Sequence, residues 1–303
     1  MNHAAAPLRL AVGIATVGRP DSLAETLHEL ARQTSPPDRI VVAHVTAADV
    51  AGVAASADVA SGATFLLSPP GLARQRNAIL DADAVADCDV LLFLDDDFLP
   101  APSYIAATLA MFRDDPGVVM TTGRVLADGA RGPGIGAAAA RAILAEAGRM
   151  PPPGPAVAPT FNGYGCNMAL RLDVMRRHAL RFDERLPLYG WYEDIDLSRR
   201  LGRHGRVVAL AGAAGVHLGV KRGRTSGRRL GYSQVVNPLY LWRKGSYPFD
   251  RAVRSVGRHV LVNGVRALRP EPWVDRRGRL AGNALAVLDL LRGRAAPERI
   301  LDL

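Results

Sequence analysis

The stretch from Val90 to Pro100, with the sequence VLLFLDDDFLP, constrains the fold of this chain more than any other. Its five leading apolar residues predict a strand that is buried on both faces of a sheet. Three consecutive carboxylates, Asp95, Asp96 and Asp97, follow at the carboxyl end of that strand, where ligands of open α/β sheets bind. Because adjacent like charges repel and hard oxygen ligands suit Mg²⁺ or Mn²⁺, the stretch predicts a divalent metal site. The alternative is a solvated acidic turn that caps the next helix.

Length and cysteine content bound the class of protein. The 303 residues suffice for one large domain, or for one domain with an appendage. Cys88 and Cys166 are too few for a disulfide framework and fit a reducing cytoplasm. The N-terminus lacks a basic-then-apolar signal pattern, and no apolar run reaches the ~18 residues of a membrane span. We therefore expect a cytoplasmic protein, either soluble or attached peripherally to the inner face of the plasma membrane.

The net charge of +9 is distributed unevenly. Residues 1–218 hold 20 Lys and Arg against 23 Asp and Glu, whereas residues 219–303 hold 18 against 6. Such a tail can bind anionic lipid, acidic glycan, a substrate diphosphate or nucleic acid. The alternative is that its arginines arise from a high-GC coding bias. The tail also carries a basic stripe beside an apolar one, typical of a helix on a membrane surface or of one that packs its valines on the domain. The stripes are Arg251, Arg254 and Arg258, and Val253, Val256 and Val260.

The order of the predicted elements indicates an α/β fold. The first strand, helix and second strand form a βαβ unit, which implies neighbouring parallel strands. Asp21 or Ser22 is the expected N-cap of that first helix. Residues 128–160 predict a Gly- and Pro-rich surface insertion with one short helix at 137–147. The expected strands are 8–16, 39–45, 63–67, 90–94, 118–124, 165–170, 207–210 and 215–217, and the expected helices are 23–33, 47–60, 72–80, 104–112, one ending near 178, 193–201 and several after 231.

A second acidic pair, Glu193 and Asp194, opens a predicted helix. Ile195, Ser198 and Leu201 fall on one face of that helix, which places the two carboxylates in its first turn. There the helix dipole favours ionisation, and an ionised carboxylate is a workable general base for a sugar hydroxyl. The alternative is ordinary charge complementarity at a helix N-terminus. The preceding Trp191 and Tyr192 suit either stacking on a sugar ring or a contact within the core.

Taken together, these features resemble the family 2 glycosyltransferases of the GT-A fold. The resemblance covers roughly residues 8–245 and implies a Rossmann-like mixed sheet flanked by helices. We expect a catalytic domain at 1–245, with the insertion at 128–160, and a basic helical C-terminal extension at 246–303. The motifs that carry the resemblance are Thr16 with Arg19 in the first loop, the Gly-x-x-x-x-Arg-Asn segment at 71–77, the Asp-x-Asp site at 95–97, the Glu-Asp pair at 193–194, and the helix at 231–244.

The resemblance implies transfer from a nucleotide-sugar donor whose diphosphate is held by Mg²⁺ or Mn²⁺, with inversion at the anomeric carbon. The implied metal ligands are Asp97, Asp95 and His217, and many members of the family supply a histidine at the place of His217. The alternative for His217 is a structural histidine at a strand end whose hydrogen bonds are made within the protein. Asp194 is the implied base, with Glu193 beside it. The implied donor-binding residues are Thr16, Arg19, Arg76, Asn77 and Asp96, and those expected to contact the acceptor or sugar are Trp191 and Tyr192.

Two departures from the family pattern matter. The second strand ends in Ala43-His44-Val45 instead of the usual Asp, which leaves uracil, guanine and thymine open as nucleobases. The Gln-x-x-Arg-Trp signature of processive polymer synthases is absent, because residues 241–244 read Leu-Trp-Arg-Lys. We therefore expect one sugar to be transferred per encounter.

The basic, Gly-rich loop after His217 has two readings. It can fold over the leaving diphosphate and neutralise it, or it can be a solvated loop. Its basic residues are Lys221, Arg222, Arg224, Arg228 and Arg229.

The preferred interpretation is a metal-dependent glycosyltransferase acting on a glycan or lipid-linked acceptor, with peripheral membrane contact left open and no nucleic acid expected. A nucleotidyltransferase that uses the same strand is one rival, although it would need a P-loop-like segment that the sequence does not clearly show. The other is a non-catalytic anion or nucleic-acid binder that works through the Arg-rich tail.

Overall fold

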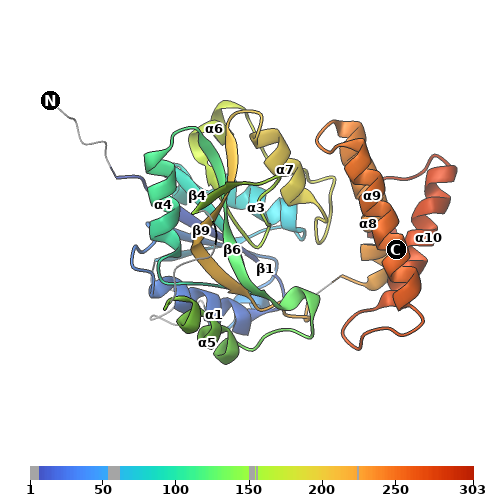
Figure 1. Cartoon of the computed structure of the whole chain (residues 1–303), viewed down its shortest axis with the longest axis horizontal. Coiled ribbons are helices and arrows are strands. Elements are labelled where there is room, and N and C mark those ends of the chain that lie inside the picture. The colour runs from blue at the N-terminus through green and yellow to red at the C-terminus, as the bar shows by residue number, and fades with distance from the viewer. Residues whose placement is uncertain (1–6, 54–61, 150–153, 155, 224) are drawn as a thin grey trace.

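The computed structural model describes residues 7–53, 62–149, 154, 156–223 and 225–303. Within them, one mixed sheet forms the centre of the molecule (Figure 1), so the predicted α/β class is confirmed. Four of its strands, β3, β2, β1 and β4, run parallel, and β8 lies antiparallel between β4 and β6. In sheet order the strands are β3 (Ala63–Leu67), β2 (Arg39–His44), β1 (Leu10–Thr16), β4 (Val90–Asp95), β8 (Asn167–Arg171), β6 (Val118–Asp128), β9 (Arg206–His217) and β5 (Phe98–Pro100), with β7 (Val157–Pro159) paired to β9.

Helices cover both faces of this sheet because its central strands are apolar on both sides. In β1, Leu10, Val12 and Ile14 face a core shared with α1 (Pro20–Ala31) and α4 (Tyr104–Asp114). The opposite core includes side chains from α3 (Leu72–Leu80), α6 (Leu172–Arg177) and α7 (Glu193–Leu201). The predicted short helix of the insertion is α5 (Ala137–Ala147), which packs Ala140 and Leu144 against the end of β9.

The strand ends that position the site come together through one antiparallel pairing. After β4, the chain turns at Asp96 and Asp97 and re-enters the sheet as β5, whose Phe98 is in register with His217 of β9. The backbone N–H of Leu218 donates to the carbonyl of Asp97 at 2.8 Å and extends that pairing. The end of β9 is therefore held against the carboxylates that end β4.

The last three long helices, α8 (Gly227–Lys244), α9 (Phe249–Arg266) and α10 (Arg276–Leu291), pack together beside the sheet (Figure 1). We call residues 227–303 the helical unit; its core includes Tyr232, Val235 and Ala286. The domain boundary that we predict at residue 245 coincides with the left-handed C-cap that separates α8 from α9, and it stays a prediction. None of the described helices is both long and apolar enough to cross a bilayer.

Some predicted elements are wrong in detail. Helix α1 begins at Pro20 with Arg19 as its N-cap, and neither Asp21 nor Ser22 caps it, because proline at the first helical position already has the required φ. The strands predicted at 207–210 and 215–217 are one continuous strand, β9. The helix predicted at 47–60 is a 3-10 helix over Ala47–Val50, and residues 54–60 of it lie outside the described residues.

Candidate active site

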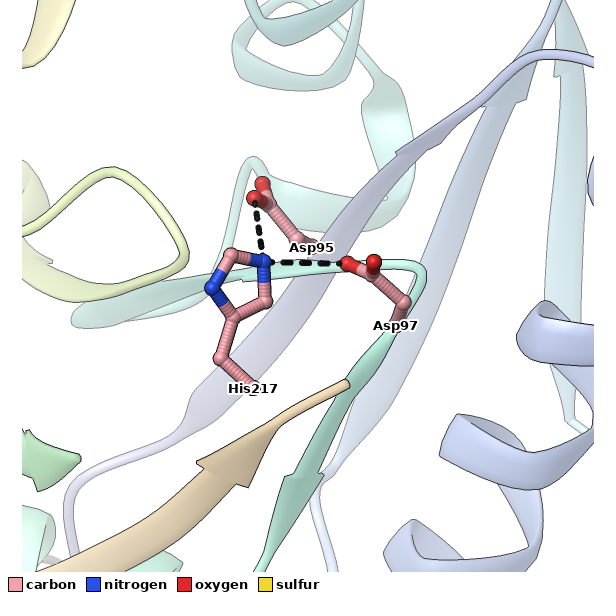
Figure 2. A group of neighbouring side chains, drawn as sticks. All are labelled: Asp95, Asp97 and His217. Atoms are coloured by element: carbon pink, nitrogen blue, oxygen red, sulfur yellow. Dashed lines mark ion pairs between the residues drawn. The ribbon is translucent and has the colours of Figure 1, made fainter. Parts of the chain in front are cut away.

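Asp95, Asp97 and His217 form a compact group at the end of β4 (Figure 2). One potential ligand atom from each lies within 4.8 Å of the other two. The Nε2 atom of His217 is 3.3 Å from Oδ1 of Asp97 and 3.9 Å from Oδ2 of Asp95. The side chain of Asp97 is also held by the chain after β9, since its Oδ2 accepts the backbone N–H of Val220 at 2.8 Å.

The imidazole of His217 is oriented by Asp128, the last residue of β6. Its Nδ1 lies 2.9 Å from Oδ1 of Asp128, whose Oδ2 accepts the hydroxyl of Tyr164 at 3.2 Å. Burial acts to lower the pKa of His217, but hydrogen bonds to Asp128 and Asp97 and the charge of Asp95 outweigh it and raise that pKa to about 10. The surrounding field is therefore strongly negative. Without a metal it holds a proton on the imidazole, and a divalent cation bound at Nε2 would have to replace that proton.

This group fits a divalent metal ion. Two carboxylates and an imidazole are ligand types used by Mn²⁺, and Asp128 supplies the carboxylate–histidine contact that typically orients a metal-binding imidazole. Burial alone would raise the pKa of Asp97, but the hydrogen bond and charge of His217 lower it to about 2. Asp97 is therefore ionised near neutral pH, as a metal ligand must be.

The predicted donor-binding residues of the first loop surround Asp96. Thr16 donates its hydroxyl to Oδ2 of Asp96 at 2.7 Å, and Arg19 forms ion pairs with Asp96 at 2.9 Å and with Asp97 at 3.4 Å. Burial raises the pKa of Asp96 to about 7, although the charge of Arg19 opposes that rise. The side chain of Arg19 is 23% exposed beside the carboxylates, whereas that of Asp96 is fully buried. Thr16, Arg19, Asp96 and Asp97 are not among the residues that line the cavity described below.

Arg76 links the two acidic sites beneath the surface. Its guanidinium is fully buried, pairs with Glu193 and with Asp95 at 3.2 Å, and donates to the carbonyl of Gly165 at 2.6 Å. Burial raises the pKa of Glu193 to about 8, against the opposing charge of Arg76. The neighbouring Asn77 instead holds the backbone of Phe182 and is not among the residues that line the cavity described below.

Asp194 occupies the first turn of α7, as predicted. Its Oδ2 accepts the backbone N–H of Gly165 at 3.0 Å and its Oδ1 accepts that of Ile195 at 2.8 Å. Burial raises the pKa of Asp194, although these two hydrogen bonds oppose the rise. The carboxylate is therefore fixed in position and more basic than an ordinary aspartate, which suits a proton acceptor.

A cavity of about 690 Å³ joins the acidic sites to the helical unit. The predicted residues Asp95, His217, Arg76, Glu193, Asp194, Trp191 and Tyr192 all line it. Trp191 stacks on Tyr192, with ring centroids 5.2 Å apart, and its buried indole N–H has no hydrogen-bond acceptor among the described residues. Trp273, from the loop between α9 and α10, lines the cavity from the helical unit.

The basic loop after His217 meets the same cavity. Lys221 lines it and donates to the carbonyls of Gly129 and Ala130, at 2.9 and 3.3 Å. Arg224 lies outside the described residues. The loop is therefore anchored to the chain beyond β6 at its first basic residue.

Asp128 and Trp273 are site residues that the sequence analysis does not identify. Asp128 contacts His217 because parallel strands β6 and β9 place the two residues in register, 89 positions apart. The available signal was weak, since Asp128 comes four residues beyond the strand predicted at 118–124, whereas β6 in fact extends to Asp128. For Trp273 we find no sequence signal, since its place depends on how α9 and α10 are joined.

Known structures share this architecture. The protein is similar to the mannosyltransferase PcManGT from Pyrobaculum calidifontis, solved with GDP-Man and Mn²⁺, at 19% identity and a TM-score of 0.54 over 98% of this chain and 80% of that chain. It is also similar to GalNAc-T7, solved with UDP, GalNAc and Mn²⁺, at 14% identity and a TM-score of 0.56 over 97% of this chain and 56% of that chain. Residues 1–349 of TarS from S. aureus match at 14% identity and a TM-score of 0.52, covering 94% of this chain and 92% of that chain. At these identities the likeness establishes the GT-A fold.

The sequence comparisons agree with the fold. No curated protein matches the chain. The model of the family described as "Glycosyltransferase like family 2" matches residues 7–225, a span that holds Asp95, Asp97, Asp194 and His217. The chain therefore belongs to family 2 of the glycosyltransferases and is an enzyme of that class.

Proposed function

We propose that the enzyme transfers a sugar from a nucleotide-sugar donor to a hydroxyl group, with inversion at the anomeric carbon and with a divalent metal ion. One observation carries this proposal. Asp95 and His217 line the same cavity of about 690 Å³ as the fixed carboxylate of Asp194, and Asp97 completes the carboxylate–imidazole group with them. A donor diphosphate bound at the carboxylate–imidazole group and an acceptor hydroxyl bound at Asp194 would lie on either side of the anomeric carbon.

Asp95, Asp97 and His217 would hold the metal. An imidazole ligand favours Mn²⁺ over Mg²⁺, because nitrogen suits the softer ion better. When bound, the ion would neutralise the charge of the donor diphosphate. Arg19, whose side chain is 23% exposed beside Asp97, would contact the donor, and Thr16 and Asp96 would hold that arginine and its loop.

Asp194 would accept the proton of the attacking hydroxyl. It is fixed by two backbone N–H groups, and burial has raised its pKa. Attack from this side, opposite the leaving diphosphate, inverts the anomeric centre in one displacement. Arg76 and Glu193 act indirectly in this scheme, because their buried ion pair holds the start of α7 beside Asp95.

The acceptor is proposed to be a glycan or a lipid-linked sugar, as in polysaccharide biosynthesis, that enters between Trp191 and Trp273. Aromatic rings stack on the apolar faces of sugars, and the unpartnered N–H of Trp191 offers a donor to a hydroxyl group. The absence of the processive signature supports one transfer per encounter. Two free, buried thiols, Cys88 and Cys166, support a cytoplasmic location.

A donor screen tests the proposal. Purified enzyme is incubated with UDP-, GDP- and dTDP-sugars and Mn²⁺, and nucleoside diphosphate release is followed with and without EDTA. We expect one nucleotide class to be turned over, only with metal, and NMR of the transfer product to show the anomeric configuration opposite to that of the donor. Turnover that survives EDTA, or a product that retains the donor configuration, would contradict it.

A further inference from the structure

The carboxyl-terminal end of α9 presents apolar side chains to solvent. Leu261 and Val265 share one face of the helix and are 66 and 61% exposed, and Leu268, just beyond the end of the helix, is 82% exposed. Val256 and Val260, by contrast, pack on the core of the helical unit. The core is thus completed by other residues of the helix, and this exposed face is left for a partner.

The same segment is strongly basic. Residues 251–270 contain five arginines and no acidic residue, although the flanking Asp250 and Glu271 form ion pairs with Arg254 and Arg266. Arg251 lies over the ring of Phe161 and faces the catalytic domain, at 4.0 Å from the ring centroid, whereas Arg258 and Arg269 are exposed. The apolar face is therefore flanked by cations at both ends, the pattern of a surface that lies on anionic lipid.

This face adjoins the cavity. The loop of residues 267–275, which follows α9, carries Leu268 near its start and Trp273 near its end, and Trp273 lines the cavity. Five residues span at most about 17 Å, so Leu268 lies within that distance of Trp273 in the cavity wall. A molecule held in the bilayer at this face would have a short path to the acidic sites.

We propose that the end of α9, comprising Leu261, Val265 and Leu268 with the flanking Arg258 and Arg269, docks the enzyme on an anionic lipid bilayer. A second copy of the same face is a poor alternative occupant, because its arginines would oppose these. Docking on a bilayer also implies the class of acceptor. The cavity receives a lipid-linked acceptor that stays anchored in the bilayer, and this part rests on the proposed function.

Vesicle flotation tests the docking. The full chain is mixed with vesicles of phosphatidylcholine alone, or of phosphatidylcholine with phosphatidylglycerol, at low and high salt. We expect the enzyme to float only with the anionic vesicles and mainly at low salt. The double variant Val265→Glu/Leu268→Glu should bind at least about tenfold more weakly, since it places two carboxylates where apolar groups would enter the membrane.

Leu291→Glu is the matched control. Leu291 is also 82% exposed but ends α10, about 22 Å along the helix axis from Arg276 at its start. Retained flotation of this control alongside loss in the double variant supports the docking face. Equal loss in both, or a wild-type dimer in light scattering that the double variant dissociates, would overturn it.

Donor hydrolysis in vesicle-free solution separates this inference from the proposed function. Unchanged hydrolysis in the double variant, together with lost flotation, confines its defect to docking. A wild-type enzyme that hydrolyses donor but never floats overturns the docking and leaves glycosyl transfer intact. A protein that floats but turns over no nucleotide sugar sustains the docking and removes the proposed function.

Discussion

The carboxylate of Asp194 is held in a fixed position and has a raised pKa. Its replacement by asparagine therefore tests whether the residue is needed as a proton acceptor or only for its position. Asparagine keeps the size of the side chain but has one acceptor oxygen, so it keeps one of the two hydrogen bonds from the N–H groups of Gly165 and Ile195. We expect Asp194→Asn to lower turnover by about 10²- to 10⁴-fold with little change in donor affinity, as measured by steady-state kinetics and by calorimetry with the donor. Near-normal turnover would mean that the base lies elsewhere.

The pH dependence gives an independent check on Asp194. Because burial raises its pKa above the ordinary value of about 3.9, activity should fall on the acid side as the pH drops through that raised value. The folded state then binds more protons than the unfolded state, so ionisation of Asp194 lowers stability as pH rises. Asp194→Asn should therefore lose the acid limb of the rate profile, and its melting temperature should fall less than that of the wild type as the pH rises through the raised pKa of Asp194.

Asp128 is expected to act through His217 without touching the substrate. Asp128→Ala removes the acceptor of the Nδ1 proton and frees the ring to turn, so Mn²⁺ affinity should fall by about 10- to 100-fold. Asp128→Asn keeps an acceptor oxygen and should retain most of the affinity. Titration with Mn²⁺, followed by the paramagnetic resonance of the free ion, measures both variants in the absence of donor. An equal loss in the two variants would show that the charge of Asp128, and not its orientation of the ring, is what matters.

The sequence predicted Asp95, Asp97 and His217 as metal ligands, and the structure brings these three residues together, because they follow local rules. Asp95 and Asp97 end an apolar strand, and a family motif marks His217. Asp128 was missed because its contact with His217 arises from the pairing of β6 with β9, which no short-range pattern encodes. The Arg76–Glu193 pair is hidden for the same reason, since its partners are 117 positions apart.

At the scale of elements, long apolar or amphipathic segments were predicted well and short or glycine-rich ones were not. Strand β4 can be recognised in the sequence as an apolar run. Strand β5 has only three residues and is positioned by its pairing with β9. Within β9, the small residues 211–215 lack the alternation of a half-buried strand, so the sequence suggested two strands where the structure has one. Propensity alone does not reveal a strand that is held by its neighbours.

The contact between α8 and α10 depends on glycine, and this gives an element-scale prediction. A Cβ atom at Gly282 of α10 would lie 2.0 Å from the carbonyl oxygen of Arg228 in α8, so the two backbones meet directly. Gly282→Ala should separate the helices and destabilise the protein by about 1 to 3 kcal/mol. The matched control is Gly257→Ala on α9, where nothing lies within 4 Å and helix propensity should add about 0.5–1 kcal/mol. Thermal unfolding of both variants measures the difference, and a neutral Gly282→Ala would contradict the close contact.

At the scale of the whole molecule, the cavity is built by parts of the chain that lie far apart in sequence. The sheet domain supplies Asp95 and Asp194, whereas the loop between α9 and α10 supplies Trp273. The helical unit thus forms part of the cavity wall. This role could not be read from the basic composition of residues 219–303, because it depends on how the helices fold back toward the sheet.

Trp273→Ala tests that role, with Trp242→Ala as its matched control. Both indoles are about equally exposed, at 39 and 40%, but Trp242 packs on Phe249 and does not line the cavity. Loss of the stacking surface at Trp273 should raise the KM for a glycoside acceptor by roughly tenfold. Donor hydrolysis without acceptor should be unchanged, because Trp273 belongs to the helical unit and is not part of the group formed by Asp95, Asp97 and His217. The measurement compares acceptor kinetics over a panel of nitrophenyl glycosides with hydrolysis of the donor alone. If the two variants have the same acceptor KM, the helical unit does not bind the acceptor through Trp273. If Trp273→Ala both raises the acceptor KM and slows donor hydrolysis, Trp273 supports the whole site and not acceptor binding alone.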